Sequence, residues 1–327
     1  MRHDQTTPSH AARLALAVAA TITSSTIPVL AGTTIFAPGV TEKTGWYDVN
    51  KKSTQNKPTI DLNMCWAAVS SNMLQYWQDG YTYAGNKLPA NIPNGAGSKI
   101  YTPGYDCYEL AIFETYLDNW DTSVPGQIFI GISWYFSGEV PNYANSAKPI
   151  TSNSGGFFAQ EYSSLQELLG ANFTMNSCDA YSTWGPWAED QSRTCLSIFS
   201  DYVSTILKKG VGGINFNTST IGGGHTTTLW GADFDDSGMV TAVYVTDSDD
   251  AMSTISTSGL KKYGISSNNS NRRVYLSDYS PSSNYGNVEI TGLFGLTAYP
   301  IPEPSAFGLF AGIGALVLIG LRRPRRI

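Results

Sequence analysis

The clearest β-pattern in the chain lies towards its C-terminal end, where a short turn connects two strand-like segments. Residues 226–234 (TTTLWGADF) and 239–246 (MVTAVYVT) are rich in β-branched and aromatic side chains, and residues 235–238 (DDSG) are turn formers. This pattern predicts an antiparallel hairpin.

The register of this hairpin decides which side chains meet at its open end. Facing residues of an antiparallel pair have position numbers with a constant sum, and a three-residue loop pairs Phe234 with Gly238. His225 then faces Asp247, so the imidazole should neighbour a carboxylate of Asp247-Ser248-Asp249. A two-residue loop would instead turn these side chains to opposite faces. The acids could orient the imidazole, solvate a loop or bind a cation, and spacing alone does not separate these roles.

Other segments predict helices and further strands, without an internal repeat. Residues 64–78 carry apolar side chains at helical spacing, with Asn63 as candidate N-cap and Asp79-Gly80 as the expected end. The other predicted helices are residues 107–119, 160–170 and 196–209, and the other predicted strands are residues 213–216, 273–275 and 288–296. We therefore expect one α+β domain.

The N-terminal end has the composition of a targeting segment. Arg2 and Arg13 precede a short apolar run, and small residues lead to a candidate cleavage site after Ala31. We expect residues 1–31 to be a secretory signal peptide, which leaves residues 32–300 as the folded domain. An uncleaved anchor or an unfolded leader is the alternative.

At the other end, residues 301–327 combine a Pro-Glu-Pro triplet, an apolar run over residues 305–321 and four arginines. A helix of that run, at about 1.5 Å per residue, just crosses a hydrocarbon core, and the arginines should stay cytoplasmic. This order resembles the PEP-CTERM sorting tail, which implies transient membrane attachment and removal by an exosortase-type sorting enzyme. A permanent tail anchor is the alternative. Both place the domain outside the cytoplasmic membrane, as an exported or cell-surface protein.

The predicted domain is acidic. Of the chain's 20 basic and 26 acidic residues, 14 basic and 24 acidic ones lie between the two ends. Because phosphate binding needs clustered Lys and Arg, we expect no nucleic-acid partner. Export permits disulfides among Cys65, Cys107, Cys178 and Cys195, and spacing makes Cys178 with Cys195 one candidate pair without fixing it.

His225 is the single histidine of the predicted domain, because His3 and His10 lie in the leader. One histidine excludes zinc sites built from several histidines, and we expect neither a metal nor a cofactor. A lone histidine is more often structural than catalytic. His225, however, follows Gly222-Gly223-Gly224, which would let a substrate backbone approach closely.

Cys65 is the candidate nucleophile that matches this histidine. It lies in the first turn of the predicted helix, where the helix dipole and free N–H groups favour a thiolate. Beside Trp66 and Ala67 it also fits an ordinary buried core position. A cysteine at a helix start, a histidine on a later strand and a polar orienting group on the next strand form the papain-type arrangement.

Eight short blocks of sequence are spread along the domain. They are Gly45-Trp46-Tyr47-Asp48, Cys65-Trp66-Ala67-Ala68, Asn72-Met73-Leu74, Gly155-Gly156-Phe157-Phe158, Leu229-Trp230-Gly231-Ala232-Asp233-Phe234-Asp235, Tyr244-Val245-Thr246-Asp247-Ser248-Asp249, Lys261-Lys262-Tyr263 and Gly292-Leu293-Phe294. In this order they resemble the IdeS/Mac family of immunoglobulin-degrading cysteine endopeptidases. The resemblance implies a papain-like fold, in which the nucleophile at a helix N-terminus packs against an antiparallel sheet that carries the histidine and the aspartate.

The same resemblance implies roles for five residues. They are Cys65 as nucleophile, His225 as general base, Asp247 as the acid that orients it, Asp249 as a supporting acid and Lys51 as a cation of the oxyanion hole. Trp66 departs from the glycine that commonly follows the nucleophile, and residues 80–150 match poorly. The immunoglobulin substrate is therefore not carried over.

The sequence thus predicts a secreted or surface-sorted cysteine endopeptidase that hydrolyses a protein or peptide substrate through an acyl-enzyme. Two other functions stay open. The scaffold could serve as a non-catalytic surface adhesin, or the acyl-enzyme could transfer its acyl group to an amine, as a transpeptidase does.

Overall fold

The computed structural model describes residues 32–51, 61–97, 110–140, 146–151, 154–160, 192–218, 223–250, 259–280 and 286–299. The predicted signal peptide, the predicted sorting tail, Cys107, Cys178 and residues 161–170 of a predicted helix lie outside these ranges. Within them, no helix combines the length and apolar character that crossing a membrane requires.

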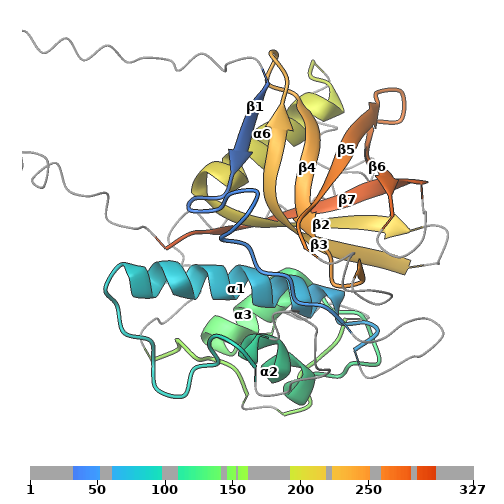
Figure 1. Cartoon of the computed structure of the whole chain (residues 1–327). Coiled ribbons are helices and arrows are strands. Elements are labelled where there is room, and N and C mark those ends of the chain that lie inside the picture. The colour runs from blue at the N-terminus through green and yellow to red at the C-terminus, as the bar shows by residue number, and fades with distance from the viewer. Residues whose placement is uncertain are drawn as a thin grey trace, which may run out of the picture.

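Seven antiparallel strands form a sheet that closes on itself (Figure 1). They are β1 (Thr33–Phe36), β2 (Gly210–Thr218), β3 (Gly223–Phe234), β4 (Val240–Thr246), β5 (Lys261–Asn268), β6 (Arg273–Tyr279) and β7 (Gly286–Thr297). The strand order is β1-β3-β2-β7-β6-β5-β4. An additional pairing of β3 with β4 closes the six strands β2 through β7 into a barrel. β1 pairs with β3 beyond the end of β2. The predicted α+β class with an antiparallel sheet is confirmed.

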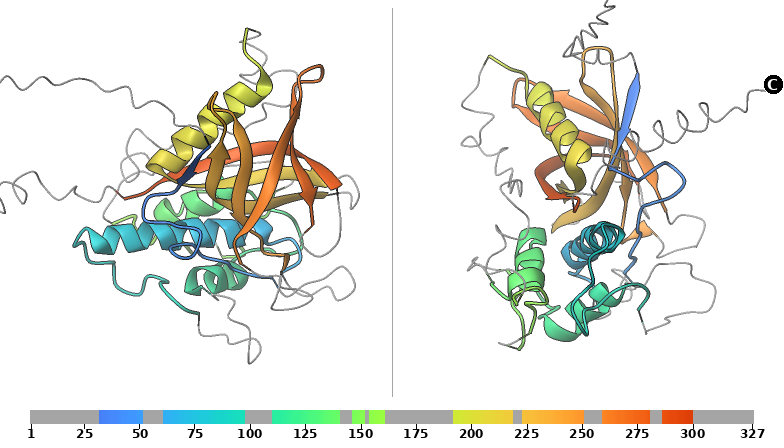
Figure 2. Two further views of the ribbon diagram at one scale, coloured as in Figure 1. Left: turned by 45° about the horizontal axis from the view of Figure 1, so that its top comes forward. Right: turned by 90° about the vertical axis from the view of Figure 1, so that its left-hand side faces the viewer.

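The helices among the described residues lie on two sides of this barrel (Figure 2). They are α1 (Cys65–Tyr83), α2 (Ala111–Asn119), α3 (Ile128–Ser137) and α6 (Cys195–Lys209). α1 contacts β2, β3 and β7 on one side and both α2 and α3 on the other, so most of its side chains are buried. α6 contacts all seven strands through its apolar face. The barrel and the α1–α3 layer share one hydrophobic core.

The ends of α1 differ from those predicted. Met64 occupies the N-cap position without a side-chain cap, because the Asn63 amide instead donates to the carbonyls of Thr122 and Ser123. The helix also continues past Gly80 to Tyr83. Gly80 packs against Tyr299: a Cβ placed on Gly80 would lie 3.5 Å from the Cβ of Tyr299. This tertiary packing outweighs the weak helix propensity of glycine.

The hairpin β3–β4 is confirmed, but its predicted register is wrong. Phe234 pairs with Val240 instead of Gly238, and Thr228 pairs with Thr246 instead of Tyr244. The cause is a longer turn, closed by a hydrogen bond from the Asp235 N–H to the Met239 carbonyl, together with two β-bulges in the pairing of β3 with β4. Near the open end the shift is two residues, which preserves the face of each side chain.

Candidate active site

The N-terminus of α1 and the open end of the β3–β4 hairpin meet where the helical layer packs on the barrel. Cys65 is the first residue of α1, His225 lies near the start of β3, and Asp247 and Asp249 follow the end of β4 directly. The backbone N–H of Lys51 donates to the Ser248 carbonyl at 2.7 Å, next to both aspartates. The structure therefore brings together all five residues that the sequence singled out.

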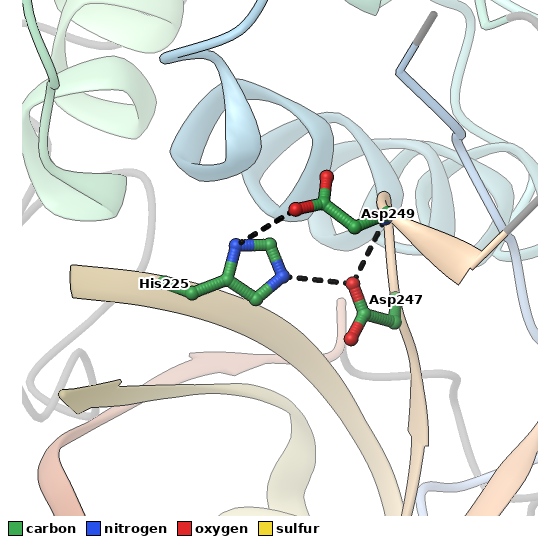
Figure 3. A group of neighbouring side chains, drawn as sticks. All are labelled: His225, Asp247 and Asp249. Atoms are coloured by element: carbon green, nitrogen blue, oxygen red, sulfur yellow. Dashed lines mark hydrogen bonds and ion pairs between the residues drawn. The ribbon is translucent and has the colours of Figure 1, made fainter. Parts of the chain in front are cut away.

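The imidazole of His225 lies between two carboxylates (Figure 3). Its Nε2 is 2.7 Å from Oδ1 of Asp247, and its Nδ1 is 3.7 Å from Oδ2 of Asp249. His225 and Asp247 are both buried, so this ion pair is shielded from solvent. Burial lowers the pKa of His225, but the charges of the two carboxylates raise it well above its ordinary value.

The side chains of Cys65 and His225 interact, and a hydrogen bond between them contributes to the pKa of each. Burial raises the pKa of the thiol, but the bond to His225 and the positive charges of His225 and Lys51 outweigh burial. The pKa of Cys65 therefore lies below its ordinary value. This environment favours a thiolate paired with an imidazolium.

Lys51 is a buried cation beside this pair. Its Nζ donates to the Leu62 carbonyl at 2.9 Å and lies 2.8 Å from Oδ1 of Asp249. Burial lowers the pKa of Lys51, whereas the negative charges of Asp249 and Cys65 raise it above its ordinary value. Two of the three ammonium donors are thus occupied, and Asp249 connects the cation to His225.

The same carboxylates and imidazole could in principle hold a metal ion. Ligand atoms of His225, Asp247 and Asp249 lie within 4.8 Å of one another, and no other such group occurs in the described part of the chain. A divalent cation there would displace the Lys51 ammonium from Asp249 and need a neutral His225. Because Oδ1 of Asp247 already pairs with His225 and Oδ1 of Asp249 with Lys51, we assign these atoms to ion pairs.

Trp66, which replaces a small residue after the nucleophile, fills space that neighbouring glycines leave open. Its indole lies 4.9 Å from the ring of Trp120 and 5.3 Å from that of Tyr116. A Cβ on Gly126 would overlap the indole, and one on Gly131 would lie 2.7 Å from it. The side chain therefore anchors the first turn of α1 in the helical layer instead of blocking the thiol.

Several polar residues around the site were not anticipated. The Tyr279 hydroxyl donates to Oδ2 of Asp247 at 2.5 Å, and the carboxyls of Asp48 and Asp250 are buried behind it. Asp48 belongs to a block that resembles the family, which could have drawn attention to it. No sequence signal distinguished Tyr279 or Asp250.

Cys195, the first residue of α6, is a free and buried thiol. Its Sγ donates to Oδ1 of Asn269 at 3.3 Å. The candidate disulfide between Cys178 and Cys195 is therefore not formed, because the sulfur of Cys195 faces the β5–β6 turn. Cys178 itself lies outside the described residues.

Comparison with known proteins places this site in a family. A family model described as Mac 1 matches residues 33–89 and 194–291. The chain is similar to the Mac-1 family in these two ranges. The two matched ranges contain Lys51 and Cys65 in the first and the histidine and both aspartates in the second. The Mac-1 match thus covers the candidate site and leaves out residues 90–193, where α2 and α3 lie.

A relative consistent with the Mac-1 assignment is the "IgM protease" of Streptococcus suis (strain P1/7). It is 27% identical over 231 residues, which make up 68% of this chain and 19% of the relative. The chain therefore spans about a fifth of the length of that protein. The resemblance to the IdeS/Mac family that the sequence blocks indicated is confirmed at the level of the family.

Proposed function

We propose that this chain is a cysteine endopeptidase with Cys65 as nucleophile and His225 as its acid–base partner. The observation that carries the proposal is the interaction of Cys65, at a helix N-terminus, with His225, whose ring is backed by the buried carboxylate of Asp247. The similarity to a relative named as a protease supports the same reaction class. The packing of α1 against the barrel supports a papain-like arrangement.

In the first half of the reaction, the Cys65 thiolate attacks the carbonyl carbon of the scissile peptide bond. The backbone N–H of Cys65 lacks an acceptor in its own helix and would donate to the developing oxyanion. The ammonium of Lys51, with one donor left, would stabilise the same charge. The His225 imidazolium then gives its proton to the leaving amine, and a thioester forms at Cys65.

In the second half, neutral His225 takes a proton from water, and the resulting hydroxide attacks the thioester. The tetrahedral intermediate collapses, the acid product leaves, and the thiolate–imidazolium pair is restored. Throughout, Asp247 holds Nε2 of His225 and stabilises its charged form. Asp249 keeps Lys51 in place through their ion pair.

The proposed substrate is a protein or peptide outside the cytoplasm. We propose residues 1–31 as the export signal, 32–300 as the protease domain and 301–327 as the sorting tail, with attachment through residues 305–321 and removal by an exosortase-type enzyme. Because residues 90–193 fall outside the family match, the IgM substrate in the relative's name is not carried over to this chain.

The proposal is tested by incubating the purified full chain, under mild reductant, with unfolded proteins and sequencing the new N-termini. Cleavage should disappear in Cys65→Ala and persist in Cys195→Ser, a control that removes a thiol from outside the site. Equal cleavage by wild type and Cys65→Ala contradicts the assignment. An added amine that appears in the product mass would identify acyl transfer instead of hydrolysis.

A further inference from the structure

The Asp247 carboxylate is held by donors on both of its oxygens. Oδ1 lies 2.7 Å from Nε2 of His225 and also accepts the backbone N–H of Asp249 at 2.9 Å. Oδ2 accepts the hydroxyl of Tyr279 at 2.5 Å. Asp247 has no exposed surface, so water cannot replace a missing donor without rearrangement. The Tyr279 hydroxyl is thus the side-chain partner of Oδ2 within the described residues.

The position of Tyr279 depends on a local departure from regular β-structure. Asp278 has a φ of 55°, in the left-handed region that non-glycine residues rarely adopt. The pairing of β6 with β7 shifts at the same place, between Leu276 and Tyr279. This irregularity ends the regular strand and directs the Tyr279 ring toward Asp247. Backbone outliers of this kind cluster at functional sites.

The ring of Tyr279 is fixed on several sides. It lies 4.6 Å from the ring of Phe216 and 5.4 Å from that of Tyr263, with His225 at 6.3 Å, and it is 1% exposed. Burial and the negative charge of Asp247 raise the pKa of Tyr279 well above its ordinary value, so the hydroxyl keeps its proton and remains a donor. Phe216 also packs against the imidazole at 5.4 Å. The hydroxyl is therefore held where the carboxylate needs it.

We propose that Tyr279 is a positioning residue of the active site: its hydroxyl fixes and stabilises the Asp247 carboxylate, and Asp247 in turn holds His225 for its work with Cys65. This inference rests on the proposed function. The Tyr279 hydroxyl donates to Asp247, so we infer that this hydroxyl acts on the thiol–imidazole pair through the carboxylate.

The charged and titratable side chains that interact with Asp247 come from several elements. They are His225 of β3, Tyr279 of β6, Tyr263 of β5, Lys51, Asp48 and Asp250. Burial raises the pKa of Asp247, and the bonds from His225 and Tyr279 lower it below its ordinary value. Removing the Tyr279 hydroxyl would let the carboxylate take up a proton at higher pH, and His225 would then lose its partner.

The test replaces Tyr279 by phenylalanine, which keeps the ring and removes the hydroxyl. We expect kcat/KM to fall about tenfold, or about 1.4 kcal/mol in the barrier, with KM unchanged. The acid limb of the pH profile should move up by about one pH unit. The matched control is Tyr275→Phe, which removes a hydroxyl from the same strand, one that accepts a hydrogen bond from the Asn271 amide, and should leave both readouts unchanged.

A double variant separates action through Asp247 from a general loss of packing. If Tyr279 acts through the carboxylate, Tyr279→Phe should cost nothing further in an Asp247→Asn background. An unchanged pH profile in Tyr279→Phe, or equal additional loss in that background, overturns the proposal. Thiol labelling of the wild type separates this result from failure of the proposed function. If Cys65 is reactive at low pH and Tyr279→Phe changes neither kcat/KM nor the pH profile, only the positioning role is contradicted. If Cys65 is unreactive, the proposed protease function is contradicted.

Discussion

Lys51 carries a buried positive charge beside the Cys65 thiol, although its ammonium already bonds to Leu62 and Asp249. If its charge stabilises the oxyanion, its effect should appear mainly in the transition state. We expect Lys51→Met to lower kcat by about a hundredfold while KM changes little, as for loss of one oxyanion donor. Steady-state kinetics on a peptide substrate measures both, with the exposed Lys43→Met as control. A kcat equal to wild type contradicts the role.

The ionisation of Cys65 gives a second test at the scale of the residue. Because the pKa of Cys65 lies below 9.0 and that of buried Cys195 lies above it, iodoacetamide should label Cys65 at pH values where Cys195 stays unlabelled. His225→Gln removes the charge and bond that lower this pKa, so its labelling profile should move to higher pH. Peptide mass spectrometry at each pH resolves the thiols. A wild-type Cys65 that titrates above 9.0 contradicts the pair.

Among the elements, the start of α1 depends on its fit against the loop that precedes α3. Gly126 contacts the indole of Trp66 so closely that a Cβ there would overlap it. We expect Gly126→Ala to destabilise the protein by about 2 kcal/mol through overpacking and to lower activity by moving Cys65. Gly264→Ala, whose Cβ would meet Ser277 at an ordinary 3.5 Å, is the control. Thermal melts and labelling of Cys65 measure both effects, and equal behaviour of the two variants contradicts this account.

The elements that could be predicted are those with a one-sided pattern. α6 alternates apolar pairs with polar residues, and β3 and β4 are β-rich segments around a turn. α3 was missed because its sequence, IFIGISWYFS, is apolar on all sides and entirely buried, which leaves no helical period. β5 was missed because half-buried polar residues such as Ser266 and Ser267 give no strand pattern. Tertiary contacts form these elements, and one sequence does not show them.

The residues of the candidate site also differ in how far the sequence could predict them. His225 could be chosen from the residues themselves, because it is the single histidine of the predicted domain. Cys65 needed the resemblance to a family as well, because Cys195 also begins a helix. Asp249 and Lys51 depended on the resemblance to a family. Tyr279 could not be found, because its contact with Asp247 requires both the closure of the barrel and the bulge at the end of β6. Nothing within residues 273–279 carries that information.

At the scale of the whole molecule, three distant segments converge behind Asp247. Asp48, three residues before Lys51, accepts the Gly259 N–H at 2.7 Å, and Asp250 lies 3.3 Å from Nζ of Lys261. Burial raises the pKa of Asp48 to about 7, although the hydrogen bond from the Gly259 N–H lowers it in part. Burial and the charges of Asp48 and Asp247 raise the pKa of Asp250 to about 9, although Lys261 lowers it in part. These carboxyls join the segments that carry the candidate site, and at neutral pH Asp250 keeps its proton while Asp48 is partly protonated.

This arrangement makes global stability depend on pH in an unusual direction. Unfolded, both carboxyls ionise near pH 3.8, so between that pH and about 9 the folded state binds more protons than the unfolded state. The contribution of Asp48 and Asp250 to stability is therefore fully present below pH 3.8 and is lost as pH rises.

Asp250→Asn mimics the protonated form at every pH, so its melting temperature relative to wild type should rise steadily from pH 5 to pH 9. The exposed Asp236→Asn, in the β3–β4 turn, should show no such trend. A constant difference between Asp250→Asn and wild type across this range would mean that Asp250 is ionised in the folded protein, held by Lys261.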